Sequence, residues 1–187
     1  DCKCDNMETL ARSCVVVATV IFIGAFLQQL PGVAGGGCGC SPLWTAYNGY
    51  CYRFFNDRNI SWIDAELRCR SFSIPCGDST SSQTIAHLVS IHSQEEMDFL
   101  TAMYESLRPK RGPSRAWIGL HDRASENCSE WIDGTTVNFT DWGTGQPNDR
   151  NGFHDCTFFA RWGDYKWNDM GCDPDNVESY ICKHPKW

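Results

Sequence analysis

The chain has 187 residues, of which 42% are hydrophobic and 13% aromatic, enough for one compact domain with a substantial core. Its formal net charge of −7 and its lack of a Lys/Arg stripe exclude a nucleic-acid-binding protein, which needs cations to neutralise phosphates. Twelve Cys in so short a chain indicate an oxidising compartment and a disulfide framework.

The amino terminus has the pattern of a targeting segment. Val15–Leu27 is a mainly apolar run that follows Arg12 and precedes small residues ending at Ala34. A membrane span needs roughly 20 apolar residues, so this run is short and fits the core of a signal peptide better. We therefore expect residues 1–34 to be a signal peptide, with Met7 as an alternative start and a signal anchor as the alternative role. We predict that the protein is secreted.

Two helices are predicted after a Gly-rich linker at 35–39. Ser61-Trp62-Ile63-Asp64 is a helix cap, and Ser93-Gln94-Glu95-Glu96 is a capping box that begins a second helix. The apolar faces predicted to enter the core are Trp62, Ala65 and Cys69 in the first helix, and Met97, Leu100, Tyr104 and Leu107 in the second.

Short strands make up most of the remaining pattern. They are predicted at Cys51–Phe55, His87–Ile91, Trp117–Leu120, Thr136–Phe139, Cys156–Phe159, Tyr165–Trp167 and Tyr180–Cys182. Two helices followed by many strands are typical of an α+β fold. The chain between Leu120 and Cys156 is mostly loop, and long ordered loops in compact domains are usually functional.

Side-chain oxygens are concentrated between Trp142 and Cys172, in a loop that a Cys156–Cys172 bridge could hold shut. They come from Gln146, Asn148, Asp149, Asp155, Asn168 and Asp169. Calcium takes six to eight oxygen ligands at about 2.3–2.6 Å, and carboxamides and carboxylates supply them. A cis bond before Pro147 would turn both flanking carboxamides the same way. The pattern favours a cation-binding loop over a solvated loop that is acidic by chance.

The ordered motifs resemble a C-type lectin-like domain. They are Trp44, Cys51-Tyr52-Arg53-Phe54-Phe55, Trp62-x-x-Ala65-Glu66-x-x-Cys69, His87-Leu88-Val89-Ser90-Ile91, Trp117-Ile118-Gly119-Leu120, Gln146-Pro147-Asn148, Trp167-Asn168-Asp169 and Cys182. The match runs from about Cys40 to Lys183, so we expect residues 40–187 to form this domain. The resemblance implies a double-loop fold with calcium sites in the long loop and sugar bound directly to one calcium.

The resemblance also implies a disulfide pattern. It pairs Cys69 with Cys182, Cys156 with Cys172, and Cys40 with Cys51 in the amino-terminal hairpin of the longer form. Cys38, Cys76 and Cys128 are then left, and we predict a Cys76–Cys128 bridge. An odd Cys in a secreted protein suggests an intermolecular bridge, so Cys38 predicts a disulfide-linked homodimer. The alternative is a Cys38 thiol capped by a small molecule.

Two calcium sites follow from the resemblance, and they match the family unequally. The sugar-bearing, primary site resembles Gln146, Asn148, Asn168 and Asp169, but His154 stands where the family has a glutamate. Imidazole is a poor calcium ligand, so this site loses a carboxylate. The auxiliary site resembles Asp122, Glu126, Asp149 and Asp155 with each acid present. We expect the auxiliary site to fill.

Sugar specificity stays open. In the family, Glu-Pro-Asn accompanies mannose-type sugars and Gln-Pro-Asp accompanies galactose-type sugars, whereas Gln146-Pro147-Asn148 is an acid-free hybrid. Galactose binders often place a Trp after the triplet for the sugar to stack on. Here the nearby aromatics are Phe153 and Trp162.

The predicted function is a secreted, calcium-dependent, carbohydrate-binding lectin. The alternative is a lectin-fold structural or protein-interaction module, such as a matrix or antifreeze-like relative, that has lost sugar binding. An enzyme is excluded because no nucleophile elbow, paired-carboxylate signature or two-His metal spacing accompanies the five His. Asn59 and Asn138 head N-glycosylation sequons, consistent with secretion; the sequon at Asn127 is less favoured because of the neighbouring Cys128.

Overall fold

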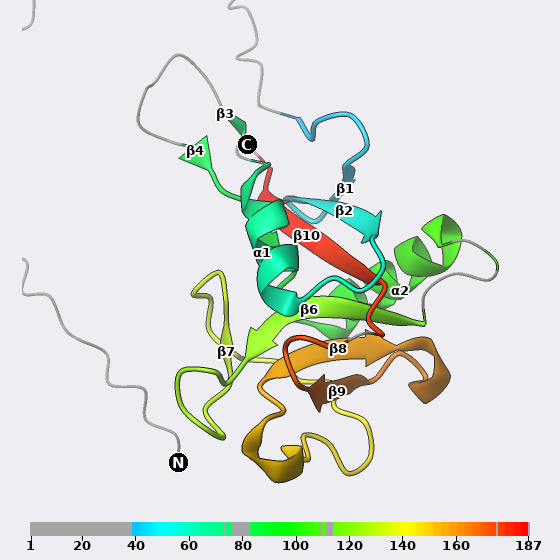
Figure 1. Cartoon of the computed structure of the whole chain (residues 1–187). Coiled ribbons are helices and arrows are strands. Elements are labelled where there is room, and N and C mark those ends of the chain that lie inside the picture. Colours follow the sequence, from blue (N-terminus) through cyan, green and yellow to red (C-terminus); the bar gives the residue numbers. More distant parts are fainter. Residues whose placement is uncertain are drawn as a thin grey trace, which may run out of the picture. The chain divides into compact units, whose positions relative to one another are not determined.

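Two helices lie against a mixed eight-stranded sheet in the computed structural model (Figure 1). The model describes residues 39–72, 74–75, 83–108, 110, 114–174 and 176–186. The predicted signal peptide, Cys38 and Cys76 lie outside these residues, so the homodimer and the Cys76–Cys128 bridge stay predictions. No helix within the described ranges combines the length and apolarity needed to cross a bilayer.

The sheet has the strand order β1-β2-β10-β6-β8-β9, with β5 paired to β10, β7 paired to β6, and β3–β4 as a separate pair. β10 and β6 run parallel, and the other pairs are antiparallel. The strands are β1 (Thr45–Tyr47), β2 (Tyr50–Asn56), β3 (Ile74–Pro75), β4 (Gln83–Thr84), β5 (His87–Leu88), β6 (Arg115–His121), β7 (Glu130–Trp131), β8 (Cys156–Ala160), β9 (Trp167–Met170) and β10 (Ser179–Pro185). The helices are α1 (Trp62–Arg70), α2 (Gln94–Leu107) and the 3-10 turns η1 (Arg150–Gly152) and η2 (Arg161–Gly163).

Successive residues of the central strands enter two different cores. Trp117 of β6 and Tyr180 of β10 pack in the core that contains the buried face of α1. The next residues, Ile118 and Ile181, pack in the core that contains the buried face of α2. Because side chains alternate along a strand, this pattern places the helices on opposite faces of the sheet, and the architecture is the predicted α+β fold.

Both predicted helix caps are formed. Ser61 Oγ accepts a hydrogen bond from Asp64 N at 3.0 Å, and Ser93 Oγ accepts one from Glu96 N at 3.2 Å. The Glu96 carboxylate accepts a hydrogen bond from the backbone N–H of His92 at 2.8 Å, and His92 directly precedes the cap residue. The predicted apolar face of α2 is wrong at Leu107, which is 54% exposed in the last turn of the helix.

Two predicted strands are wrong. Thr136–Phe139 pairs with no strand among the described residues; its Phe139 ring instead packs edge to face on Trp167, with ring centroids 5.7 Å apart. Tyr165–Trp167 fails because Tyr165 has a left-handed φ of 63°, so the chain turns there and β9 begins at Trp167. The predicted strand at His87–Ile91 is shorter, ending at Leu88.

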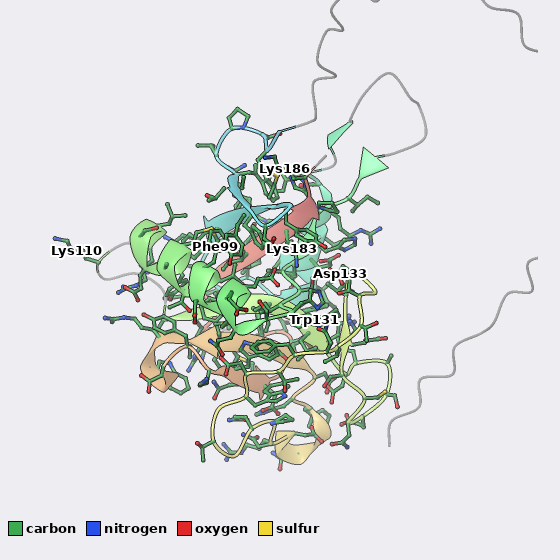
Figure 2. All side chains as sticks on the ribbon, turned by 180° about the vertical axis from the view of Figure 1, so that it is seen from behind. Phe99, Lys110, Trp131, Asp133, Lys183 and Lys186 are labelled. Carbon is green, nitrogen blue, oxygen red and sulfur yellow. A yellow bond between two sulfur atoms is a disulfide. The ribbon has the colours of Figure 1, made fainter. Side chains whose placement is uncertain are left out.

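A buried ion pair joins α2 to the sheet. Lys183 of β10 contacts Glu96 of α2, with Nζ 2.7 Å from Oε1, and Tyr52 donates to the same oxygen at 2.6 Å. Burial, reinforced by the hydrogen bond to Glu96, raises the pKa of Tyr52. Figure 2 labels Lys183 on the side of the sheet that α2 covers, with Phe99 on that helix. The pair holds α2 against β10 and, through Tyr52, against β2.

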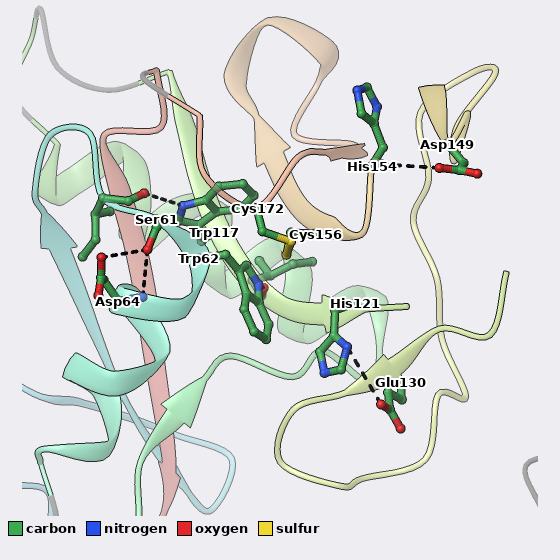
Figure 3. The surroundings of a disulfide bond; sticks show 12 residues. Ser61, Trp62, Asp64, Trp117, His121, Glu130, Asp149, His154, Cys156 and Cys172 are labelled. Atoms are coloured by element: carbon green, nitrogen blue, oxygen red, sulfur yellow. Dashed lines mark hydrogen bonds and ion pairs between the residues drawn. A yellow bond between two sulfur atoms is a disulfide. The ribbon is translucent and has the colours of Figure 1, made fainter. Parts of the chain in front are cut away.

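Three disulfides tie the elements together as the resemblance implies. Cys40–Cys51 closes the amino-terminal hairpin, and Cys69–Cys182 joins α1 to β10. Cys156–Cys172 joins the start of β8 to the residues just after β9. The last bond lies where the long loop enters β8, two residues after His154 (Figure 3).

Candidate functional site

The long loop is anchored on Trp167, the first residue of β9. Trp167 N donates to Asp141 O at 2.8 Å, and Gly143 N donates to Trp167 O at 2.9 Å. The Trp142 and Trp167 rings lie edge to face with centroids 5.9 Å apart, and the Trp167 indole is fully buried. The segment entering Gln146 is therefore held against the strand that carries Asn168 and Asp169.

Gln146 and Asn148 of the predicted primary set are linked by hydrogen bonds to Asp169. Its Oδ1 accepts from Asn148 N at 2.9 Å and its Oδ2 from Asp149 N at 2.6 Å. Asn148 Nδ2 donates to Gln146 Oε1 at 2.8 Å, and the Gln146–Pro147 bond is cis. The structure thus brings Gln146, Asn148 and Asp169 together. Asn168 precedes Asp169 in β9, and its amide donates to Lys166 O at 3.0 Å.

Three of the four predicted auxiliary residues form a tight acidic cluster. Glu126, Asp149 and Asp155 each place one carboxylate oxygen within 4.8 Å of the others. Asp155 Oδ1 is buried and has no hydrogen-bond partner. Such an oxygen is costly unless something coordinates it, and a hard cation supplies that coordination.

Asp122 lies at the edge of this cluster. Its backbone N donates to Asp155 O at 3.2 Å, while its Oδ2 accepts from Asn127 N at 3.1 Å. Burial raises the pKa of Asp122, and repulsion from Asp155 and Asp149 adds to the rise against the opposing Asn127 hydrogen bond. Partial desolvation raises the pKa of Glu126, with further repulsion from Asp149. The four acids therefore repel one another, which a divalent cation would relieve.

His154 lies between the two sets. Its backbone N donates to Asp149 Oδ1 at 3.4 Å (Figure 3), and its ring Nδ1 lies 3.7 Å from Asp169 Oδ2. That Nδ1 is buried without a hydrogen-bond partner. The His154 ring therefore lies beside the Asp169 carboxylate.

A cavity of about 320 Å³ opens between these groups. Asn148, Asp149, His154 and Asp169 line it together with side chains that the sequence did not single out: His121, Ser129, Trp142 and Thr157. Thr157 of β8 pairs with Asp169 of β9, which explains its presence. Only strand register could have identified it. His121 ends β6, and burial lowers its pKa.

The two candidate aromatic residues occupy different places. Phe153 is 74% exposed in the loop between η1 and β8, one residue from His154. Trp162 is 61% exposed but follows the other end of β8, where its ring lies 5.9 Å from the Arg115 guanidinium. Five strand residues at about 3.3 Å each separate the two ends of β8. Of these two aromatic residues, Phe153 is the one next to His154 in the chain, whereas Trp142 is the tryptophan that lines the cavity.

The glycosylation sequons lie at the surface. Asn59 is exposed with a left-handed φ of 57°. Asn138 is exposed, and its Oδ1 lies 3.0 Å from His92 Nδ1. Glycan attachment at Asn59 and Asn138 remains a proposal that this exposure permits.

Comparisons with known proteins identify the family. The family model of the lectin C-type domain matches residues 76–184. Echinoidin from Heliocidaris crassispina is 35% identical over 152 residues, covering 81% of this chain and 99% of the relative. An alpha-N-acetylgalactosamine-specific lectin from Patiria pectinifera is 38% identical over 144 residues, covering 76% and 78% of the two chains.

A solved structure gives the same result. The C-type lectin CEL-I from Cucumaria echinata aligns with a TM-score of 0.69 and 30% identity, covering 79% of this chain and 99% of that one. The chain therefore belongs to the C-type lectin family. The Patiria pectinifera relative and CEL-I are named as lectins rather than enzymes, in agreement with the sequence prediction.

Proposed function

We propose that the protein is a secreted, calcium-dependent lectin that binds a glycan at a site formed by Gln146 and Asn148 of the long loop and Asn168 and Asp169 of β9. The observation that carries the proposal is the convergence of this loop on Asp169, whose two oxygens hold the backbone N–H groups of Asn148 and Asp149. Family membership and the names of the lectin relatives support a carbohydrate ligand.

The auxiliary residues fit calcium. The side chains of Glu126, Asp149 and Asp155 offer only oxygen ligands, which calcium prefers. A cation would coordinate the Asp155 oxygen that has no hydrogen-bond partner. It would also stabilise the charged form of Asp122, whose pKa is raised. Asp122 would complete the set. Calcium here would neutralise the repelling acids and fix the loop.

The primary residues fit calcium less well. Gln146, Asn148 and Asn168 are neutral, so Asp169 is the one carboxylate of the set, and His154 contributes none. When bound, calcium would supply coordination positions for sugar hydroxyls. This chain's own residues would orient that ion through the Asp169 carboxylate and offer amide N–H groups to the sugar. Galactose-type and mannose-type sugars are both candidates.

Affinity chromatography tests the proposal. The protein should be retained on immobilised N-acetylgalactosamine, galactose or mannose in calcium and released by a chelator. Asp169→Asn should abolish retention, whereas Asp164→Asn, an exposed residue after η2, should not change it. Failure of the wild type to bind any of these resins would contradict the proposal.

One alternative has a specific observation in its favour. The acid-free triplet and His154 weaken the primary calcium site, as expected for a lectin-fold interaction module that no longer binds sugar. Such a module would keep calcium-dependent stability through the auxiliary acids. It would show no chelator-sensitive retention on any of the three resins.

A further inference from the structure

The imidazole of His154 and the carboxylate of Asp169 form a pair that calcium chemistry does not explain. The Asp169 side chain is 4% exposed, and the His154 side chain is 25% exposed. Both line the same cavity. We propose that His154 Nδ1 and Asp169 form a binding site for zinc or a similar imidazole-preferring divalent cation, and that this cation competes with calcium for Asp169.

The spacing of the two ligand atoms fits a zinc shell. Nδ1 of His154 and Oδ2 of Asp169 are 3.7 Å apart. Two ligands at about 2.1 Å from a tetrahedral zinc lie about 3.4 Å from one another, so a shift of a few tenths of an ångström suffices. At 3.7 Å the two atoms are too far apart to hydrogen-bond directly, and a cation between them would contact both.

The pair is also prepared for coordination. His154 Nδ1 is buried and makes no hydrogen bond, so binding a cation satisfies it without breaking an existing interaction. Asp169 is oriented by the N–H groups of Asn148 and Asp149, as outer hydrogen bonds commonly orient a metal-binding carboxylate. One ligand is therefore unsatisfied and the other is held in place.

The cavity has room and further oxygen atoms for the rest of the shell. Its volume of about 320 Å³ exceeds that of several waters, each of which takes about 30 Å³. The Asn148 carboxamide and the Thr157 hydroxyl belong to residues on its wall. Zinc sites that exchange ligands hold the metal through about three protein groups and leave a position for water. The cavity therefore has volume for water, and its wall includes residues that could supply a third ligand.

The chemistry separates this site from the acidic cluster. Imidazole suits zinc and copper, whereas carboxylate and carbonyl oxygens suit calcium. Glu126, Asp149 and Asp155 offer oxygen alone, and His154 adds the nitrogen.

A second histidine in the same cavity serves as a comparison. His121 Nδ1 is also buried without a hydrogen bond and lies 3.9 Å from Glu130 Oε1. Glu130, however, is 49% exposed, whereas Asp169 is 4% exposed. Figure 3 shows His121 beside Glu130 and apart from His154. The buried, hydrogen-bonded carboxylate favours His154 as the zinc ligand.

Zinc binding would have a functional consequence that rests on the proposed function. Asp169 is the one carboxylate of the primary calcium set, so zinc held there removes the charge that calcium needs. Zinc should therefore raise the calcium concentration required for glycan binding.

The metal site is tested without any glycan. Chelator-treated wild type, His154→Gln and His121→Gln are titrated with zinc chloride by isothermal calorimetry, after thermal melts confirm that each is folded. His154→Gln should weaken one zinc site at least tenfold, and His121→Gln should stay within twofold of wild type. Equal zinc affinity in wild type and His154→Gln, or a loss confined to His121→Gln, would overturn the site.

Two further measurements keep the result decisive. Electron paramagnetic resonance of bound Cu²⁺ should show coupling to a nitrogen nucleus that disappears in His154→Gln; identical spectra would contradict ligation by His154. Calcium titrations with and without zinc should then show a raised calcium midpoint in wild type alone, and an unchanged wild-type midpoint would refute the competition. A protein that binds zinc through His154 but retains no sugar resin would refute the proposed function and leave the metal site standing.

Discussion

The two candidate cation sites share one loop but differ in chemistry. The auxiliary cluster consists of carboxylates that repel one another, with one buried oxygen left unpartnered. The primary set consists of carboxamides around one buried carboxylate, with an imidazole beside it. Both sites lie in the same part of the backbone, near the Cys156–Cys172 bond. The difference in the ion that each prefers therefore comes from the identity of its side chains. A single substitution can therefore change the ion preference of one site without changing the ligand types of the other.

The largest expected effect comes from removing the covalent tie that the two sites share. The double variant Cys156→Ser/Cys172→Ser opens a loop with a sequence separation of 16 residues, which should cost about 3 kcal/mol of unfolding free energy. Denaturant unfolding measures this loss, and calcium titration should show weaker binding at both sites.

The matched control is Cys40→Ser/Cys51→Ser, which opens a loop of similar separation in the amino-terminal hairpin. It should lose comparable stability and keep calcium affinity. If both double variants change calcium affinity equally, the Cys156–Cys172 bond does not organise the sites.

Calcium should stabilise the fold through the auxiliary cluster. At a hundredfold excess over Kd, a ligand specific to the native state adds about 2.7 kcal/mol, which corresponds to a shift of several degrees in Tm. Asp155→Asn removes a carboxylate from the cluster and should abolish most of this calcium-minus-chelator difference, while Asp164→Asn should retain it. A full shift in Asp155→Asn would show that calcium stabilises the protein elsewhere.

His154→Glu should convert the primary set toward ordinary calcium chemistry. The added carboxylate beside Asp169 should lower the calcium midpoint of glycan binding at least tenfold, about 1.4 kcal/mol. Thr144→Glu adds the same charge at an exposed position of the loop and should change the midpoint far less. Equal midpoints for wild type and His154→Glu would mean that residue 154 does not reach the ion.

The smallest effect is expected outside the loop. Hydrogen bonds from Arg108 and Tyr165 lower the pKa of Glu105 to about 2. Because the folded-state pKa is lowered, this carboxylate contributes stability above its ordinary range near pH 4.5 and loses it as the pH falls toward 2. Glu105→Gln should remove this part of the acid dependence, by less than about 1 kcal/mol since the pairs are partly exposed. Acid unfolding curves test it, and calcium affinity should not change.

Sequence patterns predicted the fold better than the cavity. Helix caps at Ser61 and Ser93 are local signals, and both were correct because the interactions span three residues. The segment at Thr136–Phe139 misled because its alternation reflects packing of Phe139 on Trp167 rather than strand pairing. His121 and Thr157 reach the cavity through the pairing of β6, β8 and β9, which no local pattern specifies.

Asp149 belongs to both sites at once. Its carboxylate is part of the auxiliary cluster, while its backbone N–H holds the Asp169 carboxylate of the primary set. If a cation at one site orders Asp149, less conformational entropy is lost when the other site fills. Thermodynamic linkage makes this effect equal in both directions. Under the proposed function, calcium should therefore bind the two sites with positive cooperativity, and glycan retention should rise more steeply with calcium concentration than a single-site curve.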